Sequence, residues 1–364
     1  MWNHPDRPFQ DLPPLPPAGD VESPTVLKAA ISASRALARL DGAYERLPDP
    51  TMLINIIPLM EAQASSEIEN IVTTNDELFK AASGALPAPT PQVKEALRYR
   101  EALRAGFDSL RERPLTVRTA IEVCSRIQGR EAVIRDLPGT FIGSPATKRR
   151  IYTPPEGKGL LLDHLSAWES FLHADNGLDP LVVMALAHYQ FEAIHPFFDG
   201  NGRTGRVLNT LFLIESELLR LPILYLSGYI VRHKDTYYER LNAVTCEDAW
   251  QPWILFMLAG IESTAKWTLR IVETTDRMRA ALETRIREQN SKLPAVELSR
   301  LLYAQPYLRI ENVVETGLAK RQTAARWLTD LAGSGLIVKE KIGRTVIFVN
   351  TELLDMLFTT PLSD

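Results

Sequence analysis

Residues 195 to 206 read His195-Pro196-Phe197-Phe198-Asp199-Gly200-Asn201-Gly202-Arg203-Thr204-Gly205-Arg206. Apolar residues with helical periodicity lead into this stretch over residues 180–194 and out of it over residues 207–219, which predicts a turn between two buried helices. The turn carries an imidazole, a carboxylate, a flexible glycine-rich segment and two guanidinium groups. A salt-bridged structural corner is the alternative, but this set of groups suits the binding of a polyphosphate.

The residues of the turn have complementary chemistry. Gly200-Asn201-Gly202 can leave backbone N–H groups converging at the start of the following helix, whose dipole also favours an anion. Arg203 and Arg206 are three positions apart and point to one side of a helix, where each can bind phosphate oxygens bidentately. Asp199 is a hard oxygen ligand of the kind that Mg²⁺ prefers, and His195 can accept a proton from a nucleophile near neutral pH. The pattern indicates transfer of a nucleotide group to a hydroxyl brought by another molecule.

The string HPFFDGNGRTGR matches the motif HPFx(D/E)GNGRxxR at every fixed position, and the chain therefore resembles the Fic family. The resemblance implies a helical fold that transfers AMP from ATP to a protein hydroxyl. It implies that His195 is the base and that Asp199 holds Mg²⁺, with Arg203 and Arg206 on the β- and γ-phosphates. The nucleotide-binding residues implied by the motif are Gly200, Asn201, Gly202, Arg203, Thr204, Gly205 and Arg206.

The segment before the motif contains a second feature of interest, Ser65-Ser66-Glu67-Ile68-Glu69-Asn70. Residues 58–69 are predicted to be helical, and two carboxylates at the end of a helix are unfavourable for its dipole, so a cation from elsewhere is expected to compensate. Taken alone, these carboxylates are typical of a solvated face. The segment also resembles the inhibitory motif (S/T)xxxE(G/N) of the Fic family, with Ser65, Glu69 and Asn70 at the fixed positions. This resemblance implies that Glu69 pairs with Arg206 and blocks the productive pose of the γ-phosphate.

Residues 137–155 contain several Gly and Pro residues and side chains that alternate with the two-residue period of a strand. This pattern predicts a β-hairpin in an otherwise helical protein. In the Fic family a hairpin at this point aligns the target segment by main-chain pairing, a form of strand addition. The resemblance assigns this target-binding role to Lys148, Arg149, Arg150, Ile151, Tyr152 and Thr153. Farther along, aromatic residues of a predicted helix are typical of core packing, and the resemblance favours Tyr238 as a neighbour of the nucleotide.

His188, Glu192 and His195 share one helical face at the i, i+4 and i+7 positions, a spacing that zinc ligands can have. No further His or Cys cluster follows in the sequence, and Pro196 ends the helix at the last of the three. We therefore interpret His188 and Glu192 as core residues or as groups that support the catalytic site, and the zinc site as the weaker alternative.

The pattern changes after residue 293. Helices are expected near 295–304, 309–316 and 320–332, and strands over 336–341 and 345–350, with Gly317 in a turn. Three helices and a hairpin predict a winged helix-turn-helix. The segment from residue 317 to residue 345 contains six basic residues and two acidic ones. This excess of positive charge can bind a phosphate backbone. Contacts with protein are the alternative use of such a domain.

Length and composition set the outer limits. At 364 residues the chain can hold two domains, and its composition, 45% hydrophobic and 24% charged, is that of a globular protein. A net charge of −4 argues against a general nucleic-acid or membrane binder. The two cysteines lie in apolar helical contexts, which suggests a reducing compartment, and no leader or long apolar segment is evident. A cytoplasmic location is expected.

These observations predict a mainly α protein with a helical Fic core, a small β-hairpin flap and a C-terminal winged helix-turn-helix. The expected divisions are an arm and inhibitory helical region (1–91), a Fic catalytic core (92–290) and a winged-helix domain (291–364). The expected function is an adenylyltransferase that uses ATP and Mg²⁺ on Ser, Thr or Tyr hydroxyls of target proteins and of itself, with Glu69 as inhibitor. Two alternatives stay open: the same site removes AMP with Glu69 positioning water, or a DNA-binding regulator senses ATP. A homodimer is compatible with either reading.

Overall fold

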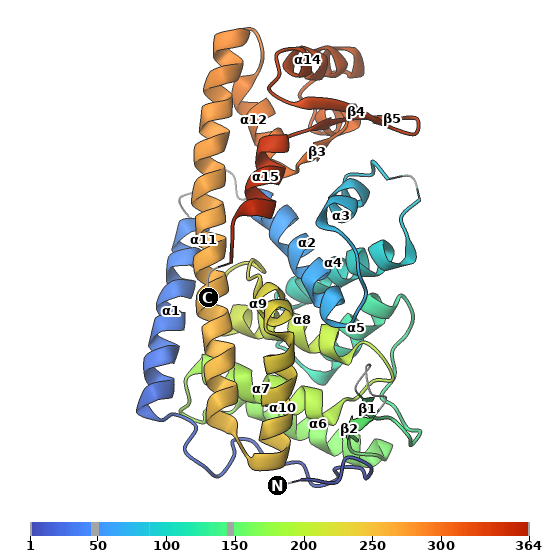
Figure 1. Cartoon of the computed structure of the whole chain (residues 1–364), viewed down its shortest axis with the longest axis vertical. Helices are drawn as coiled ribbons and strands as arrows, with labels where there is room; N and C mark the ends of the chain where they lie inside the picture. The colour runs from blue at the N-terminus through green and yellow to red at the C-terminus, as the bar shows by residue number, and fades with distance from the viewer. Residues whose placement is uncertain (1, 45–50, 87, 144–148, 363–364) are drawn as a thin grey trace.

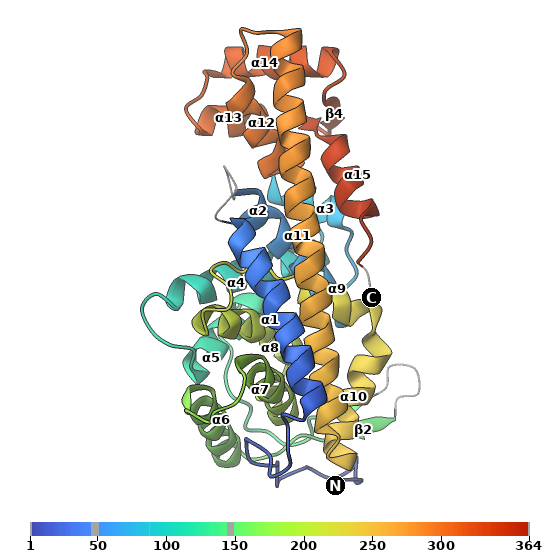
Figure 2. The ribbon, with the colours of Figure 1, turned by 90° about the vertical axis from the view of Figure 1, so that its left-hand side faces the viewer.

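One long helix, α11 (Trp250–Gln289), runs along most of the molecule and connects its two ends (Figure 1). In the computed structural model this segment is a single helix of 40 residues. The structure describes residues 2–44, 51–86, 88–143 and 149–362. Helix α1 (Pro24–Tyr44) lies beside α11 over much of its length (Figure 2), and the buried face of α1 joins the common core.

The larger end of the molecule consists of helices packed around α7 (Pro180–Ile194) and α8 (Asn201–Glu215). Nearly every residue of α7 is buried, as expected for a helix that is apolar on all sides. The helices packed against this pair are α2 (Thr51–Ile68), α4 (Pro91–Ser109), α5 (Val117–Gln128) and α6 (Lys158–His173). Helix α3 (Asn75–Ala82) packs on α2 and α4, and α9 (Leu226–Arg232) and α10 (Lys234–Glu247) pack on α11. The prediction of a mainly helical protein is confirmed.

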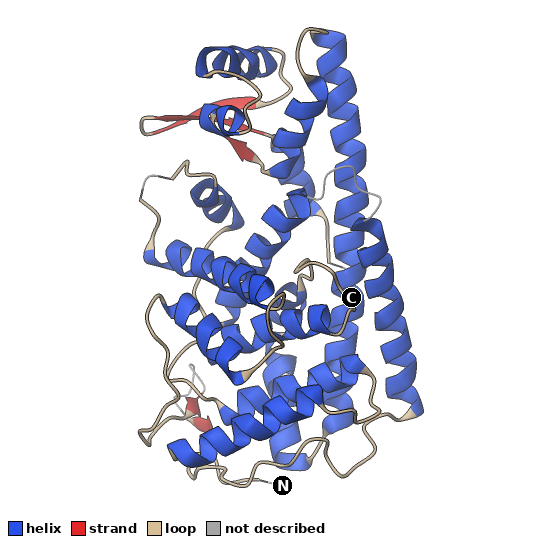
Figure 3. Cartoon of the chain, turned by 180° about the vertical axis from the view of Figure 1, so that it is seen from behind, coloured by secondary structure: helices blue, strands red, loops and turns tan. Residues whose placement is uncertain are grey.

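The strands form two small antiparallel sheets, one at each end of the molecule (Figure 3). In the first, β1 (Ile142–Gly143) pairs with β2 (Arg150–Tyr152), where the hairpin was predicted. Residues 144–148, including Lys148 of the predicted target-binding segment, lie outside the described residues.

The smaller end follows the order α12 (Ala295–Ala304), β3 (Tyr307–Leu308), α13 (Ile310–Glu315), α14 (Arg321–Gly333), β4 (Val338–Ile342), β5 (Thr345–Val349) and α15 (Thr351–Thr359). Its sheet has the order β3-β5-β4. Gly317 has a φ of +73° between α13 and α14, a conformation that costs glycine little. The sequence did not indicate β3 or α15, because two residues are too few for a periodic pattern and nine offer little more.

This smaller end, residues 295–359, contacts the two helices on either side of the predicted inhibitory segment. The Asn55 side chain of α2 donates to the Ala304 carbonyl at 3.2 Å. In α3, Asp76 accepts a hydrogen bond from the Tyr307 hydroxyl, and Phe79 stacks on a ring of α15 at 6.3 Å. Pro58 lies inside α2. Helices α2 and α3, which lie on either side of residues 69–74 in the sequence, are thus both packed against the C-terminal elements.

No helix among the described residues is long and apolar enough to cross a membrane.

Candidate active site

The turn between α7 and α8 has a tightly fixed backbone. His195 is the C-cap of α7 with a φ of +50°, and Gly200 is the N-cap of α8 with a φ of +84°. The Asn201 side chain accepts from the Phe197 N–H and donates to the Phe197 carbonyl, both at 2.8 Å. These two bonds close the turn on itself, so the groups that it carries are held in place before any ligand arrives.

The start of α8 is arranged as an anion site. The first intrahelical bond runs from the Thr204 N–H to the Gly200 carbonyl at 2.9 Å. The N–H groups of residues 201–203 have no intrahelical acceptor, as at the start of any α-helix, and the helix dipole favours a negative charge beside them. Thr204 is fully buried, so its side chain belongs to the inner face of α8.

Arg203 is held by two carboxylates. Its guanidinium forms an ion pair with Glu95 of α4 and lies 3.3 Å from Asp199. The Arg203 side chain is 3% exposed, so its position is fixed by these partners and by the surrounding core. Sequence reasoning did not predict Glu95, because a single glutamate on a helix surface 108 positions away has no distinctive pattern.

Arg206 meets the end of α2 in a buried network. It donates to the Ser65 hydroxyl at 2.8 Å, to the Ser65 carbonyl at 2.9 Å and to Glu69 Oε1 at 2.8 Å. Burial alone would raise the pKa of Glu69, but the charge and hydrogen bond of Arg206, together with the charge of Arg203 and that of His195 when protonated, hold that pKa below its ordinary value. Glu69 is therefore ionised at neutral pH. Arg206 supplies the cation that was expected to compensate the two carboxylates at the end of this helix.

The Glu69 carboxylate lies over the anion site. A Cβ atom added to Gly202 would be 2.3 Å from Glu69 Oε1 and 3.0 Å from an Arg206 nitrogen. Gly202 is in the first turn of α8, so the carboxylate occupies the place where the helix dipole and the guanidinium would both favour a phosphate. Asn70 follows with a φ of +62°, and its side-chain oxygen accepts from Lys234 Nζ at 2.9 Å.

His195 has the properties of a base. Burial, followed by the nearby Arg135 charge, lowers the pKa of His195 to about 4, so the ring is neutral at pH 7. Its Nδ1 is buried with no hydrogen-bond partner among the described residues. Arg135 holds the local backbone by donating to the His195 carbonyl at 2.7 Å and to the Ile194 carbonyl at 3.2 Å. Sequence reasoning missed Arg135, since a lone arginine in a loop carries no signal.

Asp199 is the one exposed carboxylate of the turn, with 64% of its side chain accessible. Its Oδ1 accepts from the Gly200 N–H at 2.7 Å. An accessible carboxylate beside an anion site fits Mg²⁺, which usually takes one or two carboxylates and completes its shell with phosphate oxygens and water.

A second buried cluster lies behind the turn. The His188 Nε2 atom is 2.9 Å from the Tyr237 hydroxyl, and its ring stacks on Trp253 at 5.9 Å. Burial raises the pKa of Glu192 to about 8 despite the Arg206 charge, so Glu192 is mostly protonated at neutral pH. A Cβ atom on Gly205 would be 2.5 Å from Glu192 Oε1, which explains the glycine at this position of α8.

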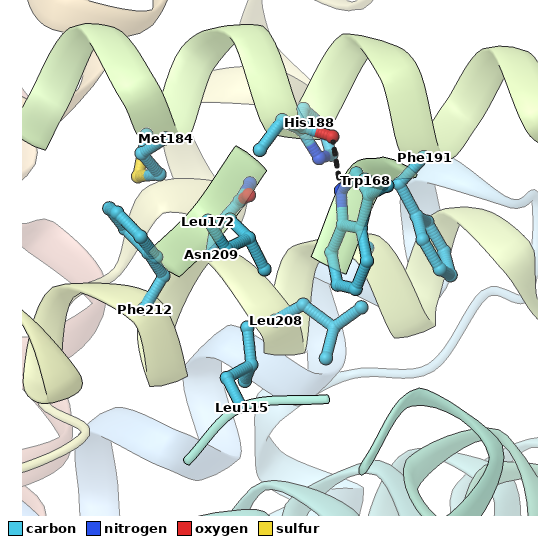
Figure 4. A pocket seen from close by; sticks show the side chains of 11 residues that line it. Leu115, Trp168, Leu172, Met184, His188, Phe191, Leu208, Asn209 and Phe212 are labelled. Atoms are coloured by element: carbon cyan, nitrogen blue, oxygen red, sulfur yellow. Dashed lines mark hydrogen bonds between the residues drawn. The ribbon is translucent and has the colours of Figure 1, made fainter. Parts of the chain in front are cut away.

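The cavity beside this cluster is too small for a substrate. Its volume of about 10 Å³ is near the lower limit for one water molecule. Figure 4 shows the apolar side chains that line it, with the Trp168 indole donating to the Ala187 carbonyl at 3.0 Å. The cavity is therefore a packing gap in the core behind the turn.

The other predicted site residues that the structure describes belong to α10 and to the β1–β2 hairpin. Tyr238 of α10 is 39% exposed. Burial raises the pKa of Tyr238, and the charge of the Glu69 carboxylate adds to this effect. In β2, Tyr152 donates to the Ala193 carbonyl at 2.8 Å, two residues before His195. Ile151, in the same strand, is 44% exposed.

Comparison with known proteins agrees with this geometry. Residues 27–108 match the Fic/DOC family N-terminal region, residues 114–213 match the Fic/DOC family, and residues 278–361 match the C-terminal domain described as protein adenylyltransferase SoFic-like. A protein adenylyltransferase Fic of Culex quinquefasciatus is 28% identical over 155 residues, which are 41% of this chain and 28% of that protein. One of Drosophila mojavensis is 34% identical over 105 residues, 27% of this chain and 20% of that protein.

The fold is also found in solved structures. A Fic family protein from Desulfovibrio desulfuricans has a TM-score of 0.57 at 19% identity, covering 93% of this chain and 98% of that one. Fic-1 from C. elegans has a TM-score of 0.54 at 20% identity, covering 69% of this chain and 75% of that one. The chain spans less than a third of the length of the two curated insect relatives described above. Three consecutive segments match Fic descriptions, the solved relatives share the fold, and the chain belongs to the Fic/DOC family.

Proposed function

We propose that the protein transfers AMP from ATP to a hydroxyl of target proteins and of itself. The observation that supports this most is the anion site at the start of α8, where the buried Arg206 binds Glu69 over Gly202, together with the neutral imidazole of His195 at the end of α7. A polyphosphate can lie along the start of the helix with its terminal phosphates against Arg203 and Arg206. The α-phosphate of the polyphosphate then lies toward His195.

The reaction can be written with His195 as the base. His195 takes the proton of the target hydroxyl, and the oxygen forms a bond to the α-phosphorus of ATP. The bond between that phosphorus and the oxygen that bridges it to the β-phosphate breaks, and pyrophosphate leaves. Arg203 and Arg206 orient the leaving phosphates and stabilise their charge. Asp199 would hold Mg²⁺, which when bound neutralises charge on the phosphates.

Autoinhibition by Glu69 is part of the proposal. The carboxylate takes one donor of the Arg206 guanidinium and lies over Gly202, so the γ-phosphate meets both a like charge and a filled site. Ser65 holds the same guanidinium through two further bonds and would keep it in place when Glu69 withdraws. Residues 1–91, which include Glu69, are thus proposed to form the inhibitory region and residues 92–290 the catalytic core.

The test is the transfer of radioactivity from ATP labelled at the α-phosphate to protein, separated by denaturing electrophoresis. The full chain should label itself weakly, and His195→Ala should not be labelled. Loss of label from a previously modified protein, without any incorporation, would favour removal of AMP instead.

The C-terminal elements support a second candidate function, DNA binding by a winged helix-turn-helix. Lys320, Arg326, Lys339, Lys341 and Arg344 are all exposed on or beside α14 and the β4–β5 hairpin. In the full chain, Lys339→Glu combined with Lys341→Glu should weaken a salt-sensitive duplex mobility shift. A wild-type protein that gives no shift at low salt would leave contacts with protein as the role of residues 291–364.

A further inference from the structure

An open hollow of about 280 Å³ lies beside the β1–β2 hairpin. Three parts of the chain form its walls: the N-terminal residues 2–5, the strand β2, and the last turn of α10. No part of the reaction proposed above uses this hollow. Its position next to β2 and its walls from distant parts of the sequence distinguish it from the gap behind the catalytic turn.

The N-terminal wall is fixed to both other walls. The Trp2 N–H donates to the Thr245 carbonyl of α10 at 3.1 Å, and the Phe9 N–H donates to the Thr153 carbonyl just after β2 at 2.9 Å. The rings of Trp2 and Phe9 stack at 4.9 Å, and Phe9 meets Tyr152 edge-on at 6.5 Å. The hollow is therefore preformed, and a ligand does not have to order its walls.

One face of α10 leads from the hollow toward the catalytic site. Tyr238, Asn242 and Thr245 are at the i, i+4 and i+7 positions and share one face of this helix. Tyr238 is near enough to Glu69 for that charge to raise its pKa, and the other two line the hollow. On the opposite side, Tyr152 joins β2 to the end of α7 through its bond to the Ala193 carbonyl. An extended segment that pairs with the hairpin would pass from His195 toward the hollow.

The lining of the hollow is basic. It contains Arg149 and Arg150 and, among the described residues that line it, no acidic side chain. The Arg150 guanidinium carbon lies 4.5 Å from the Phe141 ring centroid, a contact that orients the charge. Two cations over one small hollow suit one or two carboxylates, whereas a nucleic acid needs a longer basic track and this chain carries a net charge of −4.

We propose that this hollow, which we call the arm–flap pocket, binds acidic side chains of the target segment next to the hydroxyl that receives AMP. The proposal rests on the proposed function, since it takes the hairpin as the place where targets dock. It adds a chemical class to them: extended segments with Glu or Asp a few residues from the modified Ser, Thr or Tyr. Arg149 and Arg150 select the charge, and Trp2 limits the space available.

The test uses three fluorescent peptides of about twelve residues. Each contains one Thr in a Val- and Gly-rich extended sequence, and they differ only at two positions that hold Glu, Gln or Lys. Binding to the full chain is measured by anisotropy at low salt without ATP. The Glu peptide should bind about three- to fivefold more tightly than the Gln peptide, the size expected of one or two partly exposed ion pairs, and the Lys peptide most weakly.

Charge reversal separates the pocket from general electrostatics. Arg150→Glu should remove the preference for the Glu peptide, because it leaves Arg149 as the one cation of the described pocket lining with a carboxylate beside it. Arg104→Glu is the matched control, because that arginine lies on α4 with 84% of its side chain exposed and outside the pocket, and it should preserve the order. Unchanged thermal unfolding would show that Arg150→Glu is folded. A Glu preference that survives Arg150→Glu overturns the inference, as does an oligonucleotide of about twelve bases that displaces the Glu peptide from the wild type but not from Arg150→Glu.

These outcomes are independent of the proposed reaction. Transfer of AMP by the wild type with no preference among the peptides overturns the arm–flap pocket alone. A charge preference that depends on Arg150, in a protein that transfers no AMP, overturns the proposed function and leaves a binding site for acidic segments.

Discussion

Replacing Glu69 with glycine should increase self-labelling by AMP at least tenfold. The substitution removes the carboxylate that accepts from Arg206 at 2.8 Å and lies over Gly202. It leaves Arg206 with its two bonds to Ser65, so the guanidinium stays where the γ-phosphate needs it. The variant thus removes the carboxylate from the anion site and leaves the Arg206 guanidinium in place.

The magnitude follows from the kind of bond that is lost. A hydrogen bond between charged groups contributes about 1.5–3 kcal/mol, which corresponds to a factor of roughly 10 to 150. The Glu69 side chain is 32% exposed, so solvent screening places the effect near the lower end of that range. A tenfold increase corresponds to a barrier lower by about 1.4 kcal/mol.

The assay is incorporation of α-labelled ATP into the full chain over time. Glu67→Gly is the matched control: it places a glycine two residues before Glu69, in the last turn of α2, and Glu67 contacts Gln63 rather than Arg206. It should label at the wild-type rate. If Glu69→Gly labels no faster than the wild type, or if Glu67→Gly activates equally, the carboxylate has no inhibitory role and the reasoning is wrong.

Three further predictions follow from the same site. His195→Ala should abolish labelling while ATP affinity, measured by titration, stays within about threefold; an equal loss of affinity would indicate a structural role. Arg206→Ala should lower labelling, and adding Glu69→Gly to it should not restore labelling; activation by Arg206→Ala would contradict the proposed grip on phosphate. The pKa of Glu192 rises from 4.5 to about 8 on folding, so its stability contribution is full below about pH 4.5 and falls as pH rises toward 8, by at most about 1.4 kcal/mol per unit. Urea unfolding near pH 5 and pH 8 should show a smaller fall for Glu192→Gln, and an identical fall would refute this.

Much of the fold was predictable because its signals are local. The apolar periodicity on both sides of residue 195 predicted α7 and α8, and alternation between glycines and prolines predicted the β1–β2 hairpin. The elements that were missed are short: among them, β3 has two residues, α3 has eight and α15 has nine, and their positions depend on pairing and packing with other parts of the chain.

The site was predictable only as far as its residues are adjacent in sequence or resemble a known motif. Asp199, the glycine-rich loop and both arginines are within one turn, so one short stretch contains them all. Glu95 and Arg135 are not: each is an ordinary charged residue that tertiary structure brings to Arg203 and to the His195 carbonyl. The requirement for Gly205 likewise becomes clear only once Glu192 is seen against it.

The central claim is that the site moves the AMP part of ATP and not its terminal phosphate. The most direct measurement compares Glu69→Gly incubated with ATP labelled at the α-phosphate and with ATP labelled at the γ-phosphate. We predict that protein retains the α-label and none of the γ-label, and that His195→Ala in the same background retains neither. Retention of the γ-label, or α-labelling that persists without His195, would contradict the account.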